Sequence, residues 1–136
     1  MNRIEIEARL PHRGAMLLLD ELFPGEDGTA TARYRIRGDE WFLQGHYPDH
    51  PIVPGVILCE CMAQACCGLM ELGKGLPYLS RMEKAVFRQP VVPGQTLTLR
   101  CRKTRQLSPF TMADCEAWVE DRLCAQASMQ FVIREV

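Results

Sequence analysis

Long apolar runs, a strong net charge and internal repeats are all missing from this sequence. No apolar run approaches the roughly 20 residues that a membrane-spanning helix needs, and the N-terminal residues contain no apolar stretch of the signal-peptide kind. The formal net charge is only -1, whereas a general nucleic-acid binder is usually strongly basic. We therefore expect no membrane span, no nucleic-acid partner and a cytoplasmic location.

Linkers and low-complexity tracts are also missing, so nothing in the sequence divides the chain. Its 136 residues are enough for one domain and leave little room for a second. Hydrophobic residues make up 47% of the chain, which is ordinary for a protein with a buried core. We predict a single domain over residues 1–136.

Cysteine, by contrast, is plentiful, with seven residues of which four crowd into one segment. The four are Cys59, Cys61, Cys66 and Cys67. An odd, clustered set is unlike a secreted disulfide framework, and structural zinc sites usually use paired Cys-x-x-Cys spacing. We interpret these residues as reduced thiols that pack as small hydrophobic groups.

Three segments alternate apolar and polar residues, which is the period of a strand with one buried face. They are residues 29–37, 95–103 and 123–133. In the third segment, six apolar residues are predicted to share the inner face: Leu123, Ala125, Ala127, Met129, Phe131 and Ile133. A short polar stretch, 120–122, separates this strand from residues 113–119, which predicts a hairpin.

Residues 54–71 predict one long helix that covers the apolar face of these strands. Pro54 is well tolerated at a helix start, because its missing N–H would have no partner there. The segment is apolar on every side, so we expect it to be buried on every side. The predicted fold is therefore of the α+β class, with a long central helix wrapped by a single antiparallel β-sheet.

Glu60 and Gln64 are the only strongly polar side chains inside this helix, and they lie one turn apart on one face. A buried ionised carboxylate without partners costs several kcal/mol. Glu60 is therefore either paired or used in chemistry. From the helix alone, a structural Glu60 bonded to Gln64 or to a loop and a catalytic Glu60 are both open.

An irregular loop, residues 45–55, leads into the helix and contains three prolines and two glycines. Such a stiff loop on a rigid scaffold is a favoured place for catalytic side chains. The helix N-terminus that follows presents free N–H groups suited to an oxyanion. His46 in the loop and Glu60 in the helix therefore form a candidate acid–base pair.

His46 and His50 have a His-x-x-x-His spacing, which on a helix would suggest a metal site. Pro48 and Pro51 prevent a regular helix in this segment. We therefore expect no metal ligands here.

Four motifs carry a resemblance to a known family. They are Leu10-Pro11-His12-Arg13 with Leu17-Leu18-Leu19-Asp20, the loop Gly45-His46-Tyr47-Pro48-x-His50-Pro51-x-x-Pro54-Gly55, the helix motif Glu60-x-Met62-Ala63-Gln64, and Phe87-Arg88-Gln89-Pro90-Val91-Val92-Pro93-Gly94. In this combination the sequence resembles the β-hydroxyacyl-acyl-carrier-protein dehydratases of the FabZ type, over nearly the whole chain.

The resemblance implies a hot-dog fold and a dimer with two active sites at its interface, often assembled further as a trimer of dimers. It implies that His46 of one subunit faces Glu60 of the other. The implied substrate is a (3R)-3-hydroxyacyl thioester on acyl carrier protein, and the products are the trans-2-enoyl thioester and water. The implied role is fatty-acid or related acyl-chain biosynthesis, with no organic cofactor and no metal.

The resemblance also implies roles for single residues. His46 would take the C2 proton, and Glu60, or a water that it orders, would protonate the C3 hydroxyl. Gly55 and Val56 would bind the substrate at the helix start, with the Gly55 amide on the thioester oxygen. Gln64 would orient the carboxylate of Glu60.

Some residues depart from the family pattern or separate it from relatives. The similar dehydratase that also isomerises the double bond carries Asp where this chain has Glu60, so the resemblance implies dehydration alone. Asp49 stands where Gly is usual, Gln89 where a basic residue is common, and Cys66-Cys67 replace small residues along the acyl tunnel. The preferred acyl-chain length therefore stays open.

Two other functions fit a hot-dog domain, namely a thioesterase and a non-catalytic acyl-thioester-binding module. The pair His46 and Glu60 in dehydratase spacing argues against both. We interpret His12 as structural or part of the tunnel rim, and His50 as a residue that fixes the loop. Basic residues between Arg81 and Arg105 are either a docking rim for the acidic carrier protein or an ordinary solvated face.

Overall fold

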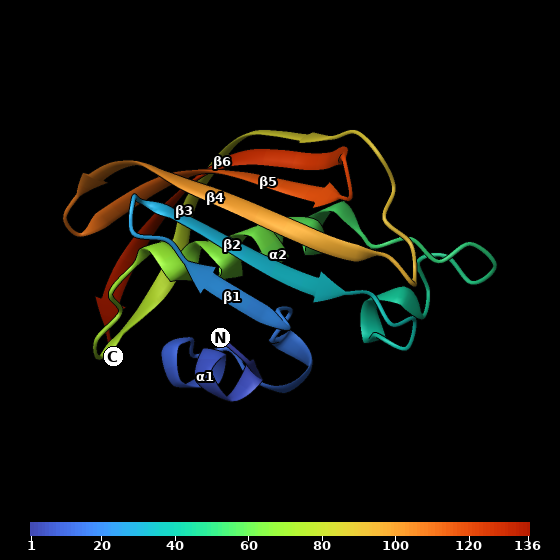
Figure 1. The fold of residues 1–136 in the computed structure, drawn as a ribbon, viewed down its shortest axis with the longest axis horizontal. Coiled ribbons are helices and arrows are strands. Elements are labelled where there is room, and N and C mark those ends of the chain that lie inside the picture. The colour runs from blue at the N-terminus through green and yellow to red at the C-terminus, as the bar shows by residue number, and fades with distance from the viewer.

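A computed structural model describes residues 1–136, and its main feature is one antiparallel sheet curved around one helix (Figure 1). The sheet has six strands in the order β1-β2-β4-β5-β6-β3. They are β1 (Glu21–Pro24), β2 (Thr29–Arg35), β3 (Gly75–Phe87), β4 (Thr96–Leu107), β5 (Phe110–Val119) and β6 (Arg122–Glu135). The helices are α1 (Arg3–Arg9) and α2 (Gly55–Cys66), with short 3-10 turns at Gly14–Met16, Trp41–Leu43 and Cys67–Leu69.

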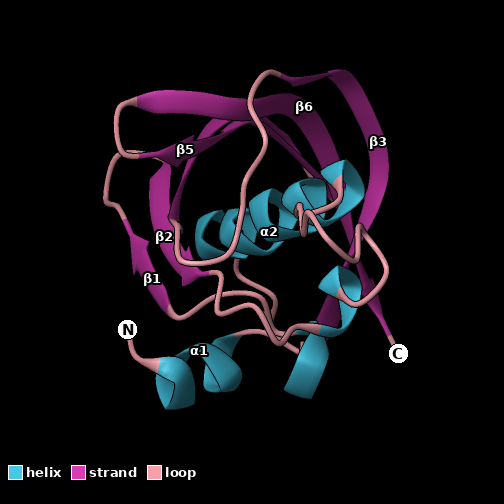
Figure 2. Cartoon of the chain, turned by 90° about the vertical axis from the view of Figure 1, so that its right-hand side faces the viewer, coloured by secondary structure: helices cyan, strands magenta, loops and turns pink.

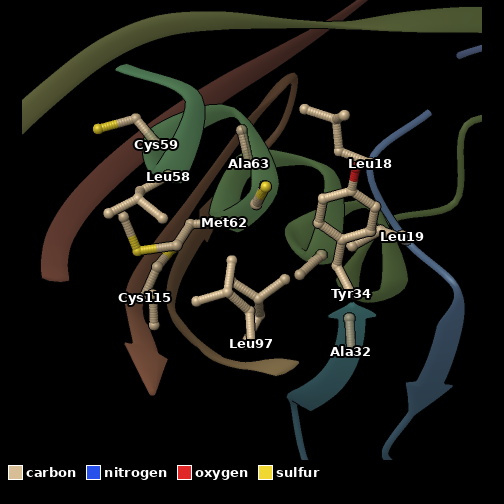
Figure 3. Packing of buried hydrophobic residues seen from close by; sticks show 14 of the residues in the cluster. Leu18, Leu19, Ala32, Tyr34, Leu58, Cys59, Met62, Ala63, Leu97 and Cys115 are labelled. Atoms are coloured by element: carbon tan, nitrogen blue, oxygen red, sulfur yellow. The ribbon is translucent and has the colours of Figure 1, made fainter. Parts of the chain in front are cut away.

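Helix α2 runs through the hollow of the curved sheet, while α1 lies outside it next to β1 (Figure 2). This is the hot-dog arrangement expected from the sequence, and the predicted α+β class is confirmed. Figure 3 shows Leu58 and Met62 of α2 close to Leu97 of β4 and Cys115 of β5. The core therefore forms between the helix and the inner face of the sheet.

The three predicted strands are present, and most of their predicted inner faces are buried. In β6, Ala125, Ala127, Met129 and Phe131 are buried as predicted, whereas Ile133 and, at the start of the strand, Leu123 are only half-buried. The prediction is wrong at that end because the pairing with β5 shifts register next to Ala117, and Cys124 turns inward instead. The predicted hairpin is confirmed, since Val119 of β5 pairs with Arg122 of β6.

The central helix is shorter than predicted, because the α-helix ends at Cys66 and a 3-10 turn follows to Leu69. The guanidinium of Arg9 on α1 donates to the carbonyls of Cys67, Gly68 and Met70, which satisfies the carbonyl groups left free at this end. Gly68 is needed there, since an added Cβ would lie 3.0 Å from the Ala30 Cβ. No helix in the structure combines the length and apolarity needed to cross a membrane.

The expectation that the helix is buried on every side is also wrong at two positions. Val56 in its first turn is 74% exposed, and the side chain of Glu60 is 33% exposed. Both residues lie on the part of α2 that the sheet of a single chain leaves uncovered. The other predicted apolar positions of the helix, from Ile57 to Cys66, are buried.

Strand β3 was not predicted, and it differs from the other strands in burial. None of its hydrophobic side chains belongs to the buried core cluster, and every residue from Tyr78 to Phe87 is exposed. It pairs with β6 on one side and forms the edge of the sheet on the other. Without a buried face it has no alternation of apolar and polar residues for sequence analysis to detect.

All seven cysteines are free and buried, as the packing interpretation expects. Burial raises the pKa of Cys61, Cys66 and Cys67, so these thiols keep their protons. The Sγ atoms of Cys66, Cys101 and Cys115 lie within 4.8 Å of one another in the core. Structural zinc needs four ligands, and this cluster offers three thiols among apolar side chains, so we interpret it as packing.

Candidate active site

The loop between the Trp41–Leu43 turn and α2 extends beyond the body of the sheet (Figure 1). Backbone hydrogen bonds within the loop hold its two arms together. Tyr47 and His50 exchange N–H···O bonds of 3.2 and 3.1 Å, and the Ile52 N–H donates to the His46 carbonyl at 2.8 Å. Beyond these bonds, Val53 is buried and its N–H donates to the carbonyl of Val91. The loop is therefore fixed at its base although its tip is exposed.

The entrance to this loop is held by a buried carboxylate that sequence analysis did not single out. Glu40 accepts hydrogen bonds from the hydroxyl of Tyr34 at 2.9 Å and from the N–H groups of Arg37 and Gly38 at 3.0 and 2.7 Å. Burial raises the pKa of Glu40, but these donors outweigh burial and bring it below the usual range. An ionised Glu40 therefore anchors the chain just before the Trp41–Leu43 turn.

The imidazole of His46 has a defined orientation and a defined tautomer. Its Nδ1 lies 3.0 Å from the carbonyl oxygen of Ile52, and its ring stacks on Tyr47 with centroids 4.2 Å apart. A carbonyl oxygen only accepts hydrogen bonds, so Nδ1 must carry the proton of the neutral ring. Nε2 is then left with a lone pair that is free to accept a proton.

The start of α2 lies directly after this loop and is packed against β3. An added Cβ on Gly55 would lie 3.1 to 3.3 Å from the ring of Phe87, so a larger residue there would require the ring to shift. The first N–H groups of a helix have no partner within the helix. Gly55 and Val56 therefore present free backbone donors at this end of α2. Phe87 is a neighbour of the site that sequence analysis placed in a motif without a role.

Glu60 and Gln64 share one helix face, as predicted, and the amide of Gln64 donates to Glu60 Oε2 at 2.8 Å. Gln64 is completely buried and fully hydrogen-bonded. Its Oε1 accepts from the Leu18 N–H at 2.8 Å, and its Nε2 also donates to the Met16 carbonyl at 2.6 Å. The N-terminal segment therefore fixes Gln64, and Gln64 fixes Glu60.

His12, which sequence analysis interpreted as structural or part of the tunnel rim, lies beside Glu60. Its Nε2 lies 3.7 Å from Glu60 Oε2, and its Nδ1 is buried without a hydrogen-bond partner. The signal for this contact was available in the Leu10–Arg13 motif, but no spacing rule connects residues 12 and 60. Only the docking of the N-terminal segment onto α2 brings them together.

His46 and Glu60 do not contact each other within one chain. His46 contacts Ile52 and Tyr47, whereas the carboxylate of Glu60 contacts Gln64 and His12. The single chain therefore holds these two side chains in separate hydrogen-bonded settings. Within one chain, no hydrogen bond or ion pair joins the two groups that sequence analysis predicted to form an acid–base pair.

The hydrogen bonds of Gln64 predict a large effect on stability. Replacing Gln64 by Leu keeps the volume but leaves the buried Leu18 N–H without a partner and removes the donor to the partly buried Met16 carbonyl. Each unpaired buried group costs about 1–3 kcal/mol, so we expect the free energy of unfolding to fall by about 2–3 kcal/mol. Urea unfolding measures this change.

Gln126→Leu is the matched control, because its amide oxygen meets only the exposed Arg88 at 3.4 Å. We expect this change to alter stability by no more than about 0.5 kcal/mol. Equal losses for the two variants would contradict the role given to the Gln64 hydrogen bonds.

The sequence matches a known protein family and several curated relatives. The family model described as FabA-like domain matches residues 10–128. The chain is 37% identical to the 3-hydroxyacyl-[acyl-carrier-protein] dehydratase FabZ of Fusobacterium nucleatum, over 98% of this chain and 97% of that protein. It is 35% identical to the FabZ of a Sulfurovum species, over 97% and 96%.

Solved structures support the fold. The dehydratase heterocomplex ApeI:P from Xenorhabdus doucetiae contains a chain that superposes with a TM-score of 0.82 at 17% identity, covering 96% of this chain and 91% of that one. The PaaI protein of Escherichia coli superposes with a TM-score of 0.65 at 18% identity, covering 82% and 81%. At such identities these likenesses bear on the fold alone.

Proposed function

This chain belongs to the FabZ-type dehydratases of the FabA-like domain family, and on that basis we propose that it dehydrates (3R)-3-hydroxyacyl-[acyl-carrier-protein] to the trans-2-enoyl thioester in fatty-acid biosynthesis. The observation that carries the proposal is the similarity to curated FabZ dehydratases over nearly the full length of both chains. The positions of His46 and Glu60 support it chemically.

In the proposed reaction His46 Nε2 takes the proton from C2 of the substrate. The electron pair of that C–H bond forms the C2–C3 double bond, and the C3–O bond breaks. Glu60, in its acid form, gives its proton to the departing hydroxyl, which leaves as water. The products are an imidazolium and a carboxylate, and one proton must pass between them before the next turnover.

The helix start supplies the proposed binding site for the thioester. Negative charge develops on the thioester oxygen as the C2 proton leaves, and the free N–H group of Gly55 is suited to stabilise it. Val56 would line the same site, and Gln64 would act by orienting Glu60. The close packing of Gly55 under Phe87 would keep this donor in place.

We further propose that the protein is a homodimer formed through β3. An unpaired edge strand is a ready template for another chain, and this one exposes a row of apolar side chains. They are Tyr78, Leu79, Met82, Val86 and Phe87. Pairing of β3 with β3 of a second copy would also cover Val56 and bring His46 of one chain to Glu60 of the other. Association of dimers into a trimer of dimers is the larger assembly that we propose.

The proposed carrier partner is acidic, and the chain offers basic side chains for it. Lys84 and Arg88 on or beside β3 are exposed without an acidic partner, whereas Arg81 and Arg102 pair with Glu83 and Asp114. We therefore assign a docking role to Lys84 and Arg88. The seven free thiols are consistent with a reducing cytoplasm, where we place the protein, and we treat residues 1–136 as a single domain.

A mass-spectrometric dehydration assay tests the proposed function. We expect 3-hydroxyacyl carrier proteins to lose one water when incubated with this protein, and kcat/KM to fall as salt concentration rises. The same thioesters on coenzyme A serve as the control for carrier docking. Release of free acid would instead indicate a thioesterase, and binding without any change in mass would indicate a non-catalytic binding module.

A further inference from the structure

The ring of His12 is held against Glu60 by a well-fixed segment of backbone. The guanidinium of Arg13 donates to the carbonyls of Leu10 and His12, each at 2.7 Å, and to the carbonyl of Glu7 at 2.6 Å. Leu10 is itself buried in the core. The hydrogen bonds of Arg13 therefore hold the turn that carries His12, and the His12 ring has a defined position beside the Glu60 carboxylate.

The two oxygens of the Glu60 carboxylate have different surroundings. Oε2 accepts from Gln64 Nε2 at 2.8 Å and lies 3.7 Å from His12 Nε2. Gln64 cannot flip its amide, because its oxygen is bound by the Leu18 N–H. Oε2 therefore always faces an N–H donor and is a poor place for a proton. Oε1 has no protein partner and is the oxygen on which an exchangeable proton belongs.

The protonation of His12 follows from its two nitrogens. Burial is the largest influence and lowers the pKa of His12, the Glu60 carboxylate opposes this, and Arg13 adds to the lowering. The ring is therefore neutral near pH 7. Buried N–H groups without partners are rarer than unpaired acceptors, so the orphaned Nδ1 carries the lone pair. The proton lies on Nε2 and is directed at Glu60 Oε2.

We propose that His12 is a positioning residue that, together with Gln64, occupies Glu60 Oε2, so that the proton given to the leaving hydroxyl resides on Oε1 and the carboxylate left behind is stabilised. This inference rests on the proposed acid role of Glu60. Hydrogen-bond donors on a carboxylate favour its ionised form. His12 therefore makes proton release from Glu60 easier without touching the substrate.

The other groups near Glu60 determine how the proposal appears in a pH profile. Gln64 does not titrate. Besides His12, the titratable groups close to Glu60 are the buried thiols of Cys61 and Cys67, which stay protonated. A reaction that needs neutral His46 and the acid form of Glu60 loses rate at low pH through His46 and at high pH through Glu60. Removing His12 should therefore move only the alkaline limb, and it should move it to higher pH.

The test compares His12→Phe with His12→Gln, using kcat across pH on a carrier-bound substrate. We expect His12→Phe to lower kcat by about 10-fold or more, since it removes the N–H that lies 3.7 Å from the carboxylate and is directed at it, with KM changed by less than about 3-fold. Its alkaline limb moves to higher pH. His12→Gln, whose amide still reaches Oε2, keeps both kcat and the alkaline limb near those of the unmodified protein. His50→Phe controls for loss of an exposed histidine and leaves the alkaline limb in place.

A double-mutant cycle separates a positioning role from a folding role. If His12 acts through Glu60, adding His12→Phe to Glu60→Gln lowers the residual rate by less than about 3-fold. An unshifted alkaline limb in His12→Phe, or equal losses in the two backgrounds, would overturn the proposal while leaving the dehydratase assignment intact. Full activity of Glu60→Gln alone would instead overturn the acid role on which both rest.

Discussion

His46→Ala should lower kcat by about 10²–10⁴-fold, the usual contribution of a general base, while leaving the fold intact. His46 is part of an exposed loop, and its one side-chain hydrogen bond is to Ile52 within that loop. Its removal therefore takes away the proton acceptor and little packing. Steady-state kinetics on a 3-hydroxyacyl carrier protein measures the loss.

Tyr47→Phe is the matched control, because it keeps the ring that stacks on His46 and removes only an exposed hydroxyl. We expect it to retain kcat within about 3-fold. The thermal midpoints of both variants should lie close to that of the unmodified protein. A His46→Ala variant that folds and turns over at the normal rate would refute the assignment of His46 as the base.

Mixing two inactive variants should restore activity if each site is shared between two chains. In a dimer of His46→Ala with Glu60→Gln, one site combines the intact Glu60 of the first with the intact His46 of the second. The other site carries both substitutions. Random pairing makes half of the dimers mixed, and each has one of its two sites intact, so we expect about one quarter of the normal activity.

Co-expression of the two variants with different affinity tags provides this mixture, and tandem purification of the mixed dimer should raise its activity to about half of normal. A double variant that carries both substitutions in one chain, paired with itself, is the control and should stay inactive. Inactive mixed dimers would show that His46 and Glu60 act within one chain and that the proposed interface is wrong.

Much of the fold was predictable because its signals are local. The alternation in residues 29–37 follows from one face meeting the core, and Ala30, Ala32 and Tyr34 are buried accordingly. The helix after Pro54 was predictable from its continuous apolar character. Its early end was not, because the Arg9 side chain that satisfies the carbonyls at this end lies 58 or more residues away in the sequence.

In the candidate site, too, the local contacts were predictable and the long-range contacts were not. The contact of Glu60 with Gln64 follows from helix geometry, since residues four apart share a face. The contacts of Gln64 with Met16 and Leu18, and of Glu60 with His12, depend on where the N-terminal segment packs. Strand β3 carries no alternating pattern, since neither of its faces is buried in the single chain.

The edge position of β3 also bears on how the chain is made. Residues 75–87 leave the ribosome well before residues 122–135, which form the only strand that pairs with β3 in the single chain. During that interval both edges of an apolar strand are open to solvent. Pairing with β6 closes one edge, and the other stays open in the finished single chain. Synthesis therefore passes through species with free strand edges, the kind on which aggregation begins when assembly is slow.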